Sequence, residues 1–195
     1  MTTKRVGLLL FPTFSEFEVT VALSLVPSTH EVVTLALEES TVRSEAGLLC
    51  QPHRKLSDLE PNDLGVLIIP GGDITHLMDA EPLFTFVREL HKQEKLLAAI
   101  CSGPYVLARA GVLAGLPYTV THSKEARDFL GCYDEETFRY ENVVTAGNVI
   151  TAQGHAFVPF GLAVGKYLDP ELSANVYNFY EGRSNASIEA PRDPV

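Results

Sequence analysis

One cysteine of this sequence lies in a setting that suits a nucleophile. Cys101 stands in the stretch LAAICSGPYV, where the apolar run 97–100 is followed by Ser-Gly-Pro and by a helical pattern that stops at Gly111. This arrangement is close to the G-x-S-x-G nucleophile elbow, with cysteine for serine and Ala99 for the first glycine. Small neighbours suit a strained turn, and N–H groups at the start of the next helix favour a thiolate. We therefore predict that Cys101 is a reactive nucleophile, and the alternative is a buried, inert cysteine.

Two backbone N–H groups could bind the negative charge that such a nucleophile creates. The apolar run 65–70 ends at Pro70-Gly71-Gly72, and the Gly72 N–H could join the Ser102 N–H in an oxyanion site. A tight turn between a strand and a helix would explain the glycines equally well. The spacing leaves both roles open, because one turn can serve both.

Glu18 and His122 are the side chains that could move protons near Cys101. His122 follows the run YTVT and would lie at the same edge of the sheet, as a base or as a substrate contact. Glu18 lies within an otherwise apolar helical pattern, beside Phe17 and Val19. Each residue has an ordinary alternative, which is a structural histidine at a strand end or a glutamate that faces solvent.

Short apolar runs alternate with helical patterns along the chain, and this order predicts the elements that position these residues. We predict strands at 5–11, 31–37, 65–70, 96–100 and 118–122, hairpins at 41–51 and 142–152, and helices at 15–25, 82–93, 104–110, 123–126, 156–168 and from 171. Strands that alternate with helices form a mostly parallel sheet covered on both faces. Ligands bind at the carboxyl ends of such strands, where Gly72, Cys101 and His122 would lie.

Composition restricts the class of protein and its partners. A chain of 195 residues, 46% hydrophobic and 21% charged, suits one α/β domain, which we place at 1–182, followed by a polar tail at 183–195. A formal net charge of −10 argues against nucleic acid or an anionic membrane as a partner. We expect no transmembrane span, and three cysteines without metal-like spacing fit a cytoplasmic protein. The sequence shows no ligand cluster and no phosphate-binding glycine loop, so we expect neither a metal nor an organic cofactor.

The motifs, taken together, resemble a known family. IIPGG, AAICSGP, VTH and TAQG follow one another as in the ThiJ/PfpI family, and the resemblance extends from residue 5 to about residue 168. This family belongs to the class I glutamine-amidotransferase-like superfamily and includes the Parkinson's-disease-associated protein deglycase. The resemblance implies a flavodoxin-like three-layer sandwich with a nucleophile elbow, and it implies a homodimer.

The resemblance also implies roles for particular residues. Glu18, in FSEFEVTVAL, matches the glutamate on the family's first helix that contacts the elbow cysteine. Cys101 would then attack a small carbonyl compound or carbonyl adduct, as in a glyoxalase, a deglycase or an amidase-like hydrolase, while Glu18 and His122 move protons. The alternative is a stress-response sensor or chaperone-like protein, in which Cys101 is oxidised to a sulfinate stabilised by Glu18.

Three positions depart from the patterns of the family's members. Ser102 stands where members described as proteases often carry histidine, so a Cys-His dyad of that kind is absent. The first helix lacks the Asp-x-x-Gly of isonitrile hydratases, which disfavours that activity. Gln153 stands where the deglycase carries a basic residue, which weakens the transfer of its substrate preference.

Overall fold

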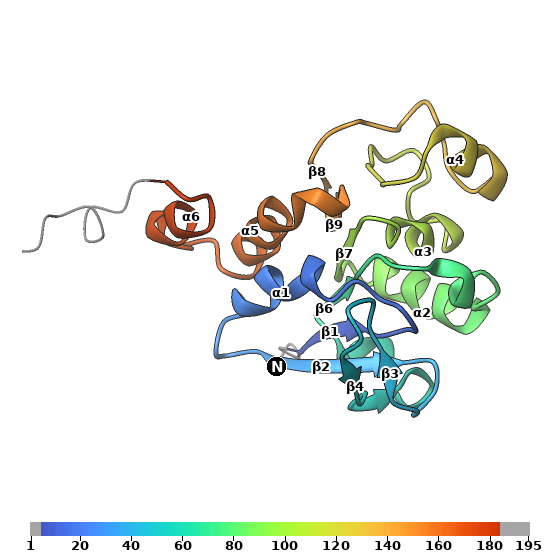
Figure 1. Ribbon diagram of the computed structural model, residues 1–195, viewed down its shortest axis with the longest axis horizontal. Coiled ribbons are helices and arrows are strands. Elements are labelled where there is room, and N and C mark those ends of the chain that lie inside the picture. Colours follow the sequence, from blue (N-terminus) through green and yellow to red (C-terminus); the bar gives the residue numbers. More distant parts are fainter. Residues whose placement is uncertain (1–4, 184–195) are drawn as a thin grey trace, which may run out of the picture.

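A seven-stranded sheet forms the centre of the molecule in the computed structural model, which describes residues 5–183 (Figure 1). The strand order is β5-β2-β1-β6-β7-β9-β8. All neighbouring strands are parallel except β8 and β9, which form an antiparallel hairpin, so the predicted mostly parallel sheet is confirmed. The strands are β1 (Arg5–Leu9), β2 (Glu31–Ala36), β5 (Arg54–Lys55), β6 (Val66–Ile69), β7 (Leu96–Ile100), β8 (Val143–Ala146) and β9 (Val149–Ala152).

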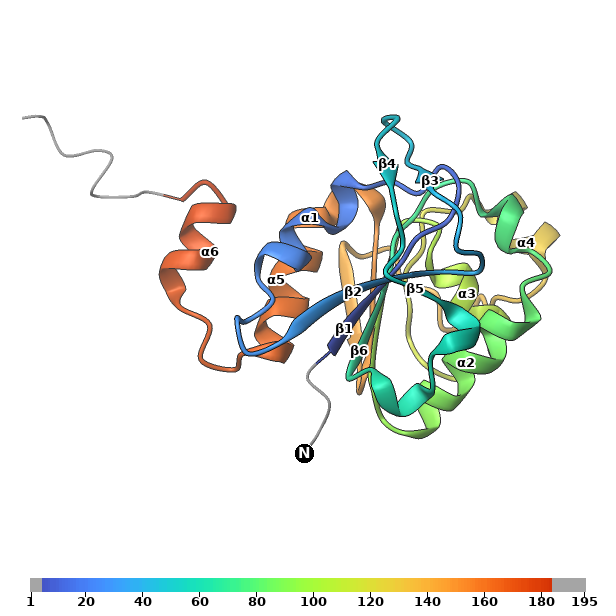
Figure 2. The ribbon, with the colours of Figure 1, turned by 90° about the horizontal axis from the view of Figure 1, so that it is seen from below.

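Helices cover both faces of this sheet, as Figure 2 shows. The helices are α1 (Phe17–Ser24), α2 (Glu81–Lys92), α3 (Pro104–Arg109), α4 (Lys124–Leu130), α5 (Phe157–Leu168) and α6 (Ala174–Tyr180). α1 and α5 pack together on one face, and α2 and α3 pack together on the other. α4 and α6 lie at opposite ends of the molecule in Figure 1. The predicted three-layer α/β sandwich is therefore confirmed.

Short elements complete the chain. β3 (Val42–Arg43) and β4 (Leu49–Cys50) pair in a separate antiparallel hairpin, which confirms the hairpin predicted at 41–51. Four 3₁₀ turns connect longer elements within residues 5–183, and they are η1 (Leu56–Asp58), η2 (Pro61–Asp63), η3 (Ile74–Leu77) and η4 (Gly154–Ala156).

The inner strands are apolar throughout because helices cover both of their faces. Every residue of β6 and β7 is buried. Burying an aliphatic side chain of this size contributes roughly 1.5–3 kcal/mol relative to exposure, so these strands form a rigid layer. The layer ends at Ile69 and Ile100, immediately before the residues that build the candidate site.

The strand predicted at 118–122 is absent, and side-chain hydrogen bonds together with isolated backbone hydrogen bonds hold this segment instead. Tyr118 makes a single bridge to Phe138. The Thr119 N–H donates to Thr151 Oγ1 at 3.0 Å, and the Gln153 side chain donates to the carbonyl of Val120 at 3.0 Å. Because these side chains satisfy part of the backbone and single backbone bonds, such as that from the Thr121 N–H to Cys101 O, satisfy other parts, the apolar alternation of YTVTH does not require a β-ladder. The sequence prediction also missed the two-residue strand β5.

Within residues 5–183, none of the helices has the length and apolar character needed to cross a membrane. The domain boundary at residue 182 stays a prediction. The tail predicted at 183–195 lies outside the described residues, apart from Arg183.

Candidate active site

Cys101 occupies a strained turn between β7 and α3. Its φ of +60° lies in the left-handed region, which a non-glycine residue adopts at a cost of roughly 1–3 kcal/mol. Neighbouring segments hold this conformation, since the Cys101 N–H donates to Ala152 O at 2.9 Å and its carbonyl accepts from the Thr121 N–H at 2.8 Å. Gly103 is required because a Cβ there would lie 2.6 Å from Ile69 O. The strand–turn–helix setting predicted for Cys101 is present.

Glu18 lies against Cys101, in the first turn of α1. Its side chain is only 2% exposed, and its Oε2 accepts a hydrogen bond from the Gly71 N–H at 2.8 Å. Its carboxyl group also hydrogen-bonds Cys101. Gly71 and Gly154 pack so closely against the pair that neither position has room for a side chain. A Cβ at Gly71 would lie 2.4 Å from Cys101 Cβ, and one at Gly154 would lie 2.9 Å from Glu18 Oε1. Glu18 is thus a buried partner of the cysteine and not a glutamate that faces solvent.

Burial and mutual repulsion govern the protons of this pair. Burial raises the pKa of Glu18, although hydrogen bonds from Cys101 and Gly71 oppose the rise. Burial, followed by the Glu18 carboxylate, raises the pKa of Cys101 to about 12, while the Ser102 N–H and the Thr121 hydroxyl lower it. Because adjacent anions repel each other in a buried site, the pair keeps one proton near neutral pH. A thiolate at Cys101 therefore requires a protonated Glu18.

A hydrogen-bond network supports the sulfur from the side of residues 119–121. The Thr121 hydroxyl lies beside Cys101 and lowers its pKa, accepts from the Gly154 N–H at 2.8 Å, and donates to Gln153 Oε1 at 3.0 Å. Gln153 Nε2 donates in turn to Thr119 Oγ1 at 2.6 Å. The residue type alone does not single out Thr121. Its place in the motif VTH is the signal that could have found it.

Gly72 and Ser102 lie together, but their donors are already engaged. The Gly72 N–H donates to Ser102 Oγ at 3.0 Å, and the Ser102 hydroxyl donates to Gly72 O at 2.8 Å. The Ser102 N–H hydrogen-bonds the Cys101 sulfur. Gly72 has a φ of +129°, and a Cβ there would lie 2.3 Å from Thr13 O, so the turn itself requires glycine. An oxyanion would have to displace the Ser102 hydroxyl to reach the Gly72 N–H, and the predicted oxyanion role of this pair stays a prediction.

His122 is half-buried and follows Thr121 directly, but its ring contacts a tyrosine. Nδ1 lies 3.1 Å from Tyr133 Oη, and the two rings meet edge to face. Burial, together with Arg127, lowers the pKa of His122, so the imidazole is neutral near pH 7. In the part of the chain that the structure describes, the ring hydrogen-bonds Tyr133 and not Cys101. A catalytic contact between His122 and Cys101 stays a prediction.

The other thiols lie apart from this arrangement. Cys50 on β4 and Cys132 after α4 are half-buried free cysteines. Among residues 5–183, histidine, cysteine and carboxylate side chains do not gather in a group of three that could hold a metal ion. The structure therefore brings Cys101, Glu18 and Ser102 together, apart from the other two thiols.

Known proteins share both sequence and fold with this chain. The sequence model of the DJ-1/PfpI family matches residues 4–166. An isonitrile hydratase from Pseudomonas putida is 29% identical over 84% of this chain and 72% of its own length. A deglycase from Pyrococcus horikoshii is 29% identical over 44% of this chain and 52% of its own length. The chain thus spans little more than half the length of this deglycase, and it spans 58% of the length of another curated relative.

The fold itself recurs in solved structures. The thiJ/pfpI family protein from Bacillus anthracis superposes with a TM-score of 0.81 at 25% identity, over 93% of this chain and 90% of that one. This similarity confirms the flavodoxin-like fold that the sequence resemblance implies.

Proposed function

The chain belongs to the DJ-1/PfpI family, and from this membership we propose that it is an enzyme whose Cys101 attacks a small carbonyl compound or carbonyl adduct. The reaction would be that of a glyoxalase, a deglycase or an amidase-like hydrolase. A deglycase and an isonitrile hydratase among the similar proteins support catalysis by this family. The absence of Asp-x-x-Gly from the first helix favours the carbonyl reactions over isonitrile hydration.

The contact between Cys101 and Glu18 is the observation that carries this proposal. A cysteine that served only packing would not need a left-handed backbone, and a buried carboxyl group is costly unless it is paired or protonated. The strained backbone of Cys101 and the buried carboxyl group of Glu18 meet at one point of the fold, the carboxyl end of the central strand β7. Strain and shifted pKa values concentrated in this way are typical of catalytic sites.

A single proton transfer from Cys101 to Glu18 can supply both a nucleophile and a proton donor. Transfer of the thiol proton to the Glu18 carboxylate leaves a thiolate. The thiolate's electron pair forms a C–S bond with the carbonyl carbon while the C=O π pair moves to oxygen. Once the sulfur has lost its negative charge, the Ser102 N–H beside it would turn to that oxygen and stabilise it, and Glu18 then returns the proton to the oxygen. With an aldehyde the product of this step is a neutral hemithioacetal. With an amide, Glu18 gives the same proton to the nitrogen instead, the oxyanion re-forms the C=O bond as the C–N bond breaks, and a neutral amine leaves with a thioester remaining on Cys101.

Turnover of methylglyoxal by the purified full chain tests the proposal. We expect Cys101→Ala to abolish turnover, because the nucleophile is lost. Cys50→Ala and Cys132→Ala remove thiols outside the site and should keep near wild-type turnover. Parallel assays with a glycated amine and with a small amide distinguish the three reaction types. Turnover that survives Cys101→Ala would refute a cysteine-dependent mechanism.

The same pair also suits an oxidation sensor, which is the second candidate. A Cys101 thiolate and hydrogen peroxide give a sulfenic acid and hydroxide, which takes the proton from Glu18 and leaves as water, and a second peroxide oxidises the sulfenic acid to the sulfinic acid with release of a second water. A protonated Glu18 would donate a hydrogen bond to that product. Mass spectrometry after peroxide treatment tests this candidate. A sulfinic acid formed selectively at Cys101, and less stable in Glu18→Leu, together with an absence of carbonyl turnover, would favour the sensor over the enzyme.

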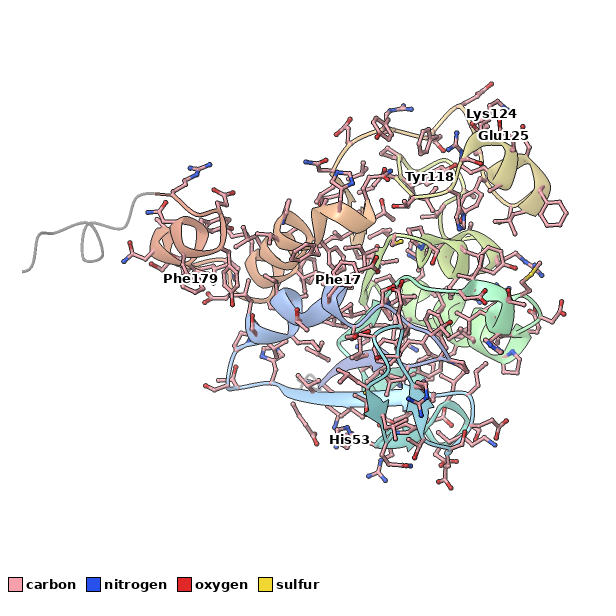
Figure 3. All side chains as sticks on the ribbon, in the orientation of Figure 1. Phe17, His53, Tyr118, Lys124, Glu125 and Phe179 are labelled. Carbon is pink, nitrogen blue, oxygen red and sulfur yellow. The ribbon has the colours of Figure 1, made fainter. Side chains whose placement is uncertain are left out.

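We further propose a cytoplasmic homodimer, the assembly that the family resemblance implies. Exposed apolar side chains support an interface: Phe17 on α1, labelled in Figure 3, is 49% exposed, and Leu48 and Leu49 on the β3–β4 hairpin are 57% and 64% exposed. The Glu45 N–H donates to Phe14 O at 2.9 Å, so the hairpin adjoins the segment that leads into α1. Light scattering tests the assembly, and a mass of one chain at micromolar concentration would refute the dimer.

A further inference from the structure

His122 is anchored at both its ring and its backbone. Nδ1 lies 3.1 Å from Tyr133 Oη, and the ring centroids are 5.8 Å apart at 74°. Arg127 Nη1 donates to the His122 carbonyl at 2.8 Å. Arg127 is only 8% exposed and is itself held by Glu135 through bonds of 2.6 and 2.8 Å. These contacts fix the ring and occupy Nδ1, so that Nε2 is the nitrogen available to a ligand.

Tyr133 is in turn held by an aromatic stack. Its ring lies nearly parallel to that of Tyr118, with centroids 5.5 Å apart at 16°, and Tyr118 packs against Phe138 at 5.8 Å. Tyr118 is labelled in Figure 3, in the part of the molecule formed by α4 and the segment after it. Within residues 5–183 the buried Tyr118 hydroxyl has no hydrogen-bond partner. The two stacked tyrosines therefore differ in one respect that can be tested, which is contact with His122.

We propose that Tyr133 is a positioning residue whose hydroxyl donates to His122 Nδ1 and so holds His122 as the tautomer with its hydrogen on Nε2. This inference rests on the proposed function, because it gives His122 a role toward the carbonyl substrate. A phenol has a hydrogen to donate, and a neutral imidazole accepts at whichever nitrogen lacks one. Burial raises the pKa of Tyr133, whereas burial and Arg127 lower that of His122. The phenol therefore stays protonated and the imidazole stays neutral.

This tautomer decides what His122 can do in the reaction. Because Nδ1 already accepts from Tyr133, the ring offers a substrate the Nε2–H as a donor and has no free lone pair. The thiol proton of Cys101 then goes to Glu18 and not to the imidazole. The His122 Nε2–H would bind the carbonyl oxygen together with the Ser102 N–H, in place of the Gly72 N–H that Ser102 occupies.

Nitrogen NMR of the full chain labelled with ¹⁵N-histidine tests the tautomer without any substrate. We expect His122 in the wild type to carry hydrogen on Nε2 and none on Nδ1 near pH 7. Tyr133→Phe keeps the aromatic stack but should mix the two tautomers. Tyr118→Phe is the matched control, since it removes a hydroxyl of the same stack that does not touch His122, and it should leave the His122 signals unchanged. Hydrogen on Nδ1 in the wild type would overturn the proposal.

Kinetics of the same two variants test the positioning role. Tyr133→Phe should lower kcat for the carbonyl substrate by about threefold to tenfold, the loss expected for one hydrogen bond, and change KM less. Cys101 alkylation should stay at the wild-type rate in both variants. Equal kcat values for Tyr133→Phe and Tyr118→Phe would refute the positioning role. If the wild type turned over no carbonyl substrate while NMR showed the expected tautomer, the proposed function would fail and the tautomer assignment would stand.

Discussion

At the scale of single residues, Cys101 and Glu18 behave as one chemical unit. Cysteines at helix starts become thiolates chiefly through backbone N–H groups. At Cys101 the Ser102 N–H and the Thr121 hydroxyl lower the thiol pKa, but burial and the Glu18 carboxylate outweigh them. α3 has only six residues, so its start adds little beyond the Ser102 N–H. We therefore expect the proton that the two side chains share to control the reactivity of the sulfur.

His122 is expected to serve the substrate and not the thiol. We predict that His122→Ala leaves the alkylation rate of Cys101 by iodoacetamide near the wild-type value, because Glu18 receives the thiol proton. Turnover of a small dicarbonyl should fall by about tenfold to hundredfold, as expected for the loss of an oxyanion donor. Peptide mapping measures alkylation and steady-state kinetics measures turnover. A parallel loss of both would show that His122 is the base that activates the cysteine.

At the scale of elements, the contact between α1 and α5 places Glu18. Gly161 on α5 faces α1, and a Cβ there would lie 2.5 Å from Val21 Cγ1 and 2.8 Å from the Ala22 nitrogen. Glu18 lies one turn earlier on α1, so a shift of this helix would move the carboxyl group away from the sulfur. We therefore expect Gly161 to be needed for the position of Glu18 as well as for packing.

Gly161→Ala tests this link between packing and chemistry. Alanine normally stabilises a helix interior by about 1 kcal/mol over glycine. Here we expect overpacking to destabilise the protein by roughly 1–3 kcal/mol and to lower turnover. Gly165→Ala on the same helix is the matched control, because its Cβ would meet side chains only, at 3.0 Å and beyond. Urea unfolding measures the stability of both variants, and equal stability of the two would contradict the prediction.

Elements whose own side chains determine their structure could be predicted from the sequence. Elements whose structure depends on hydrogen bonds from distant parts of the chain could not. Continuous apolar runs identify β6 and β7 because both faces of these strands are buried. YTVTH alternates like a strand, yet Thr151 and Gln153, about thirty positions further along the chain, provide the hydrogen bonds that replace a ladder. The burial of Glu18 followed only from the family resemblance, since its local sequence fits a surface helix equally well. The contacts of Tyr133 could not be predicted, because they produce no recognisable pattern in the sequence around it.

At the scale of the whole molecule, the sheet assembles the site from segments that are distant in sequence. Parallel β6 and β7 bring Gly71 and Cys101 to one edge, and the end of β9 adds Gly154. α1, near the start of the chain, supplies Glu18. Because the buried strands cannot shift independently, the strained turn at Cys101 is held by the entire core.

Glu18 should also shape the pH dependence of the stability of the whole protein. Its pKa is raised in the folded state, so its contribution to stability is largest below the unfolded pKa and is lost as pH rises through the folded pKa. Glu18→Gln cannot ionise and should lack this decline, gaining on the order of 1 kcal/mol over the wild type at neutral pH. Thermal unfolding from about pH 4 to about pH 8 measures the difference. Parallel stability curves for the two proteins would contradict the raised pKa.

The thiolate absorbance of Cys101 against pH tests most directly whether Cys101 and Glu18 share one proton. The measurement uses a chain in which Cys50→Ser and Cys132→Ser remove the other thiols. In this parent we predict that the absorbance becomes complete only at high pH, toward about 12, because an ionised Glu18 opposes the second charge. Adding Glu18→Gln should give a single transition at lower pH, since the opposing carboxylate is gone. Superimposable titration curves for the two proteins would contradict the shared proton.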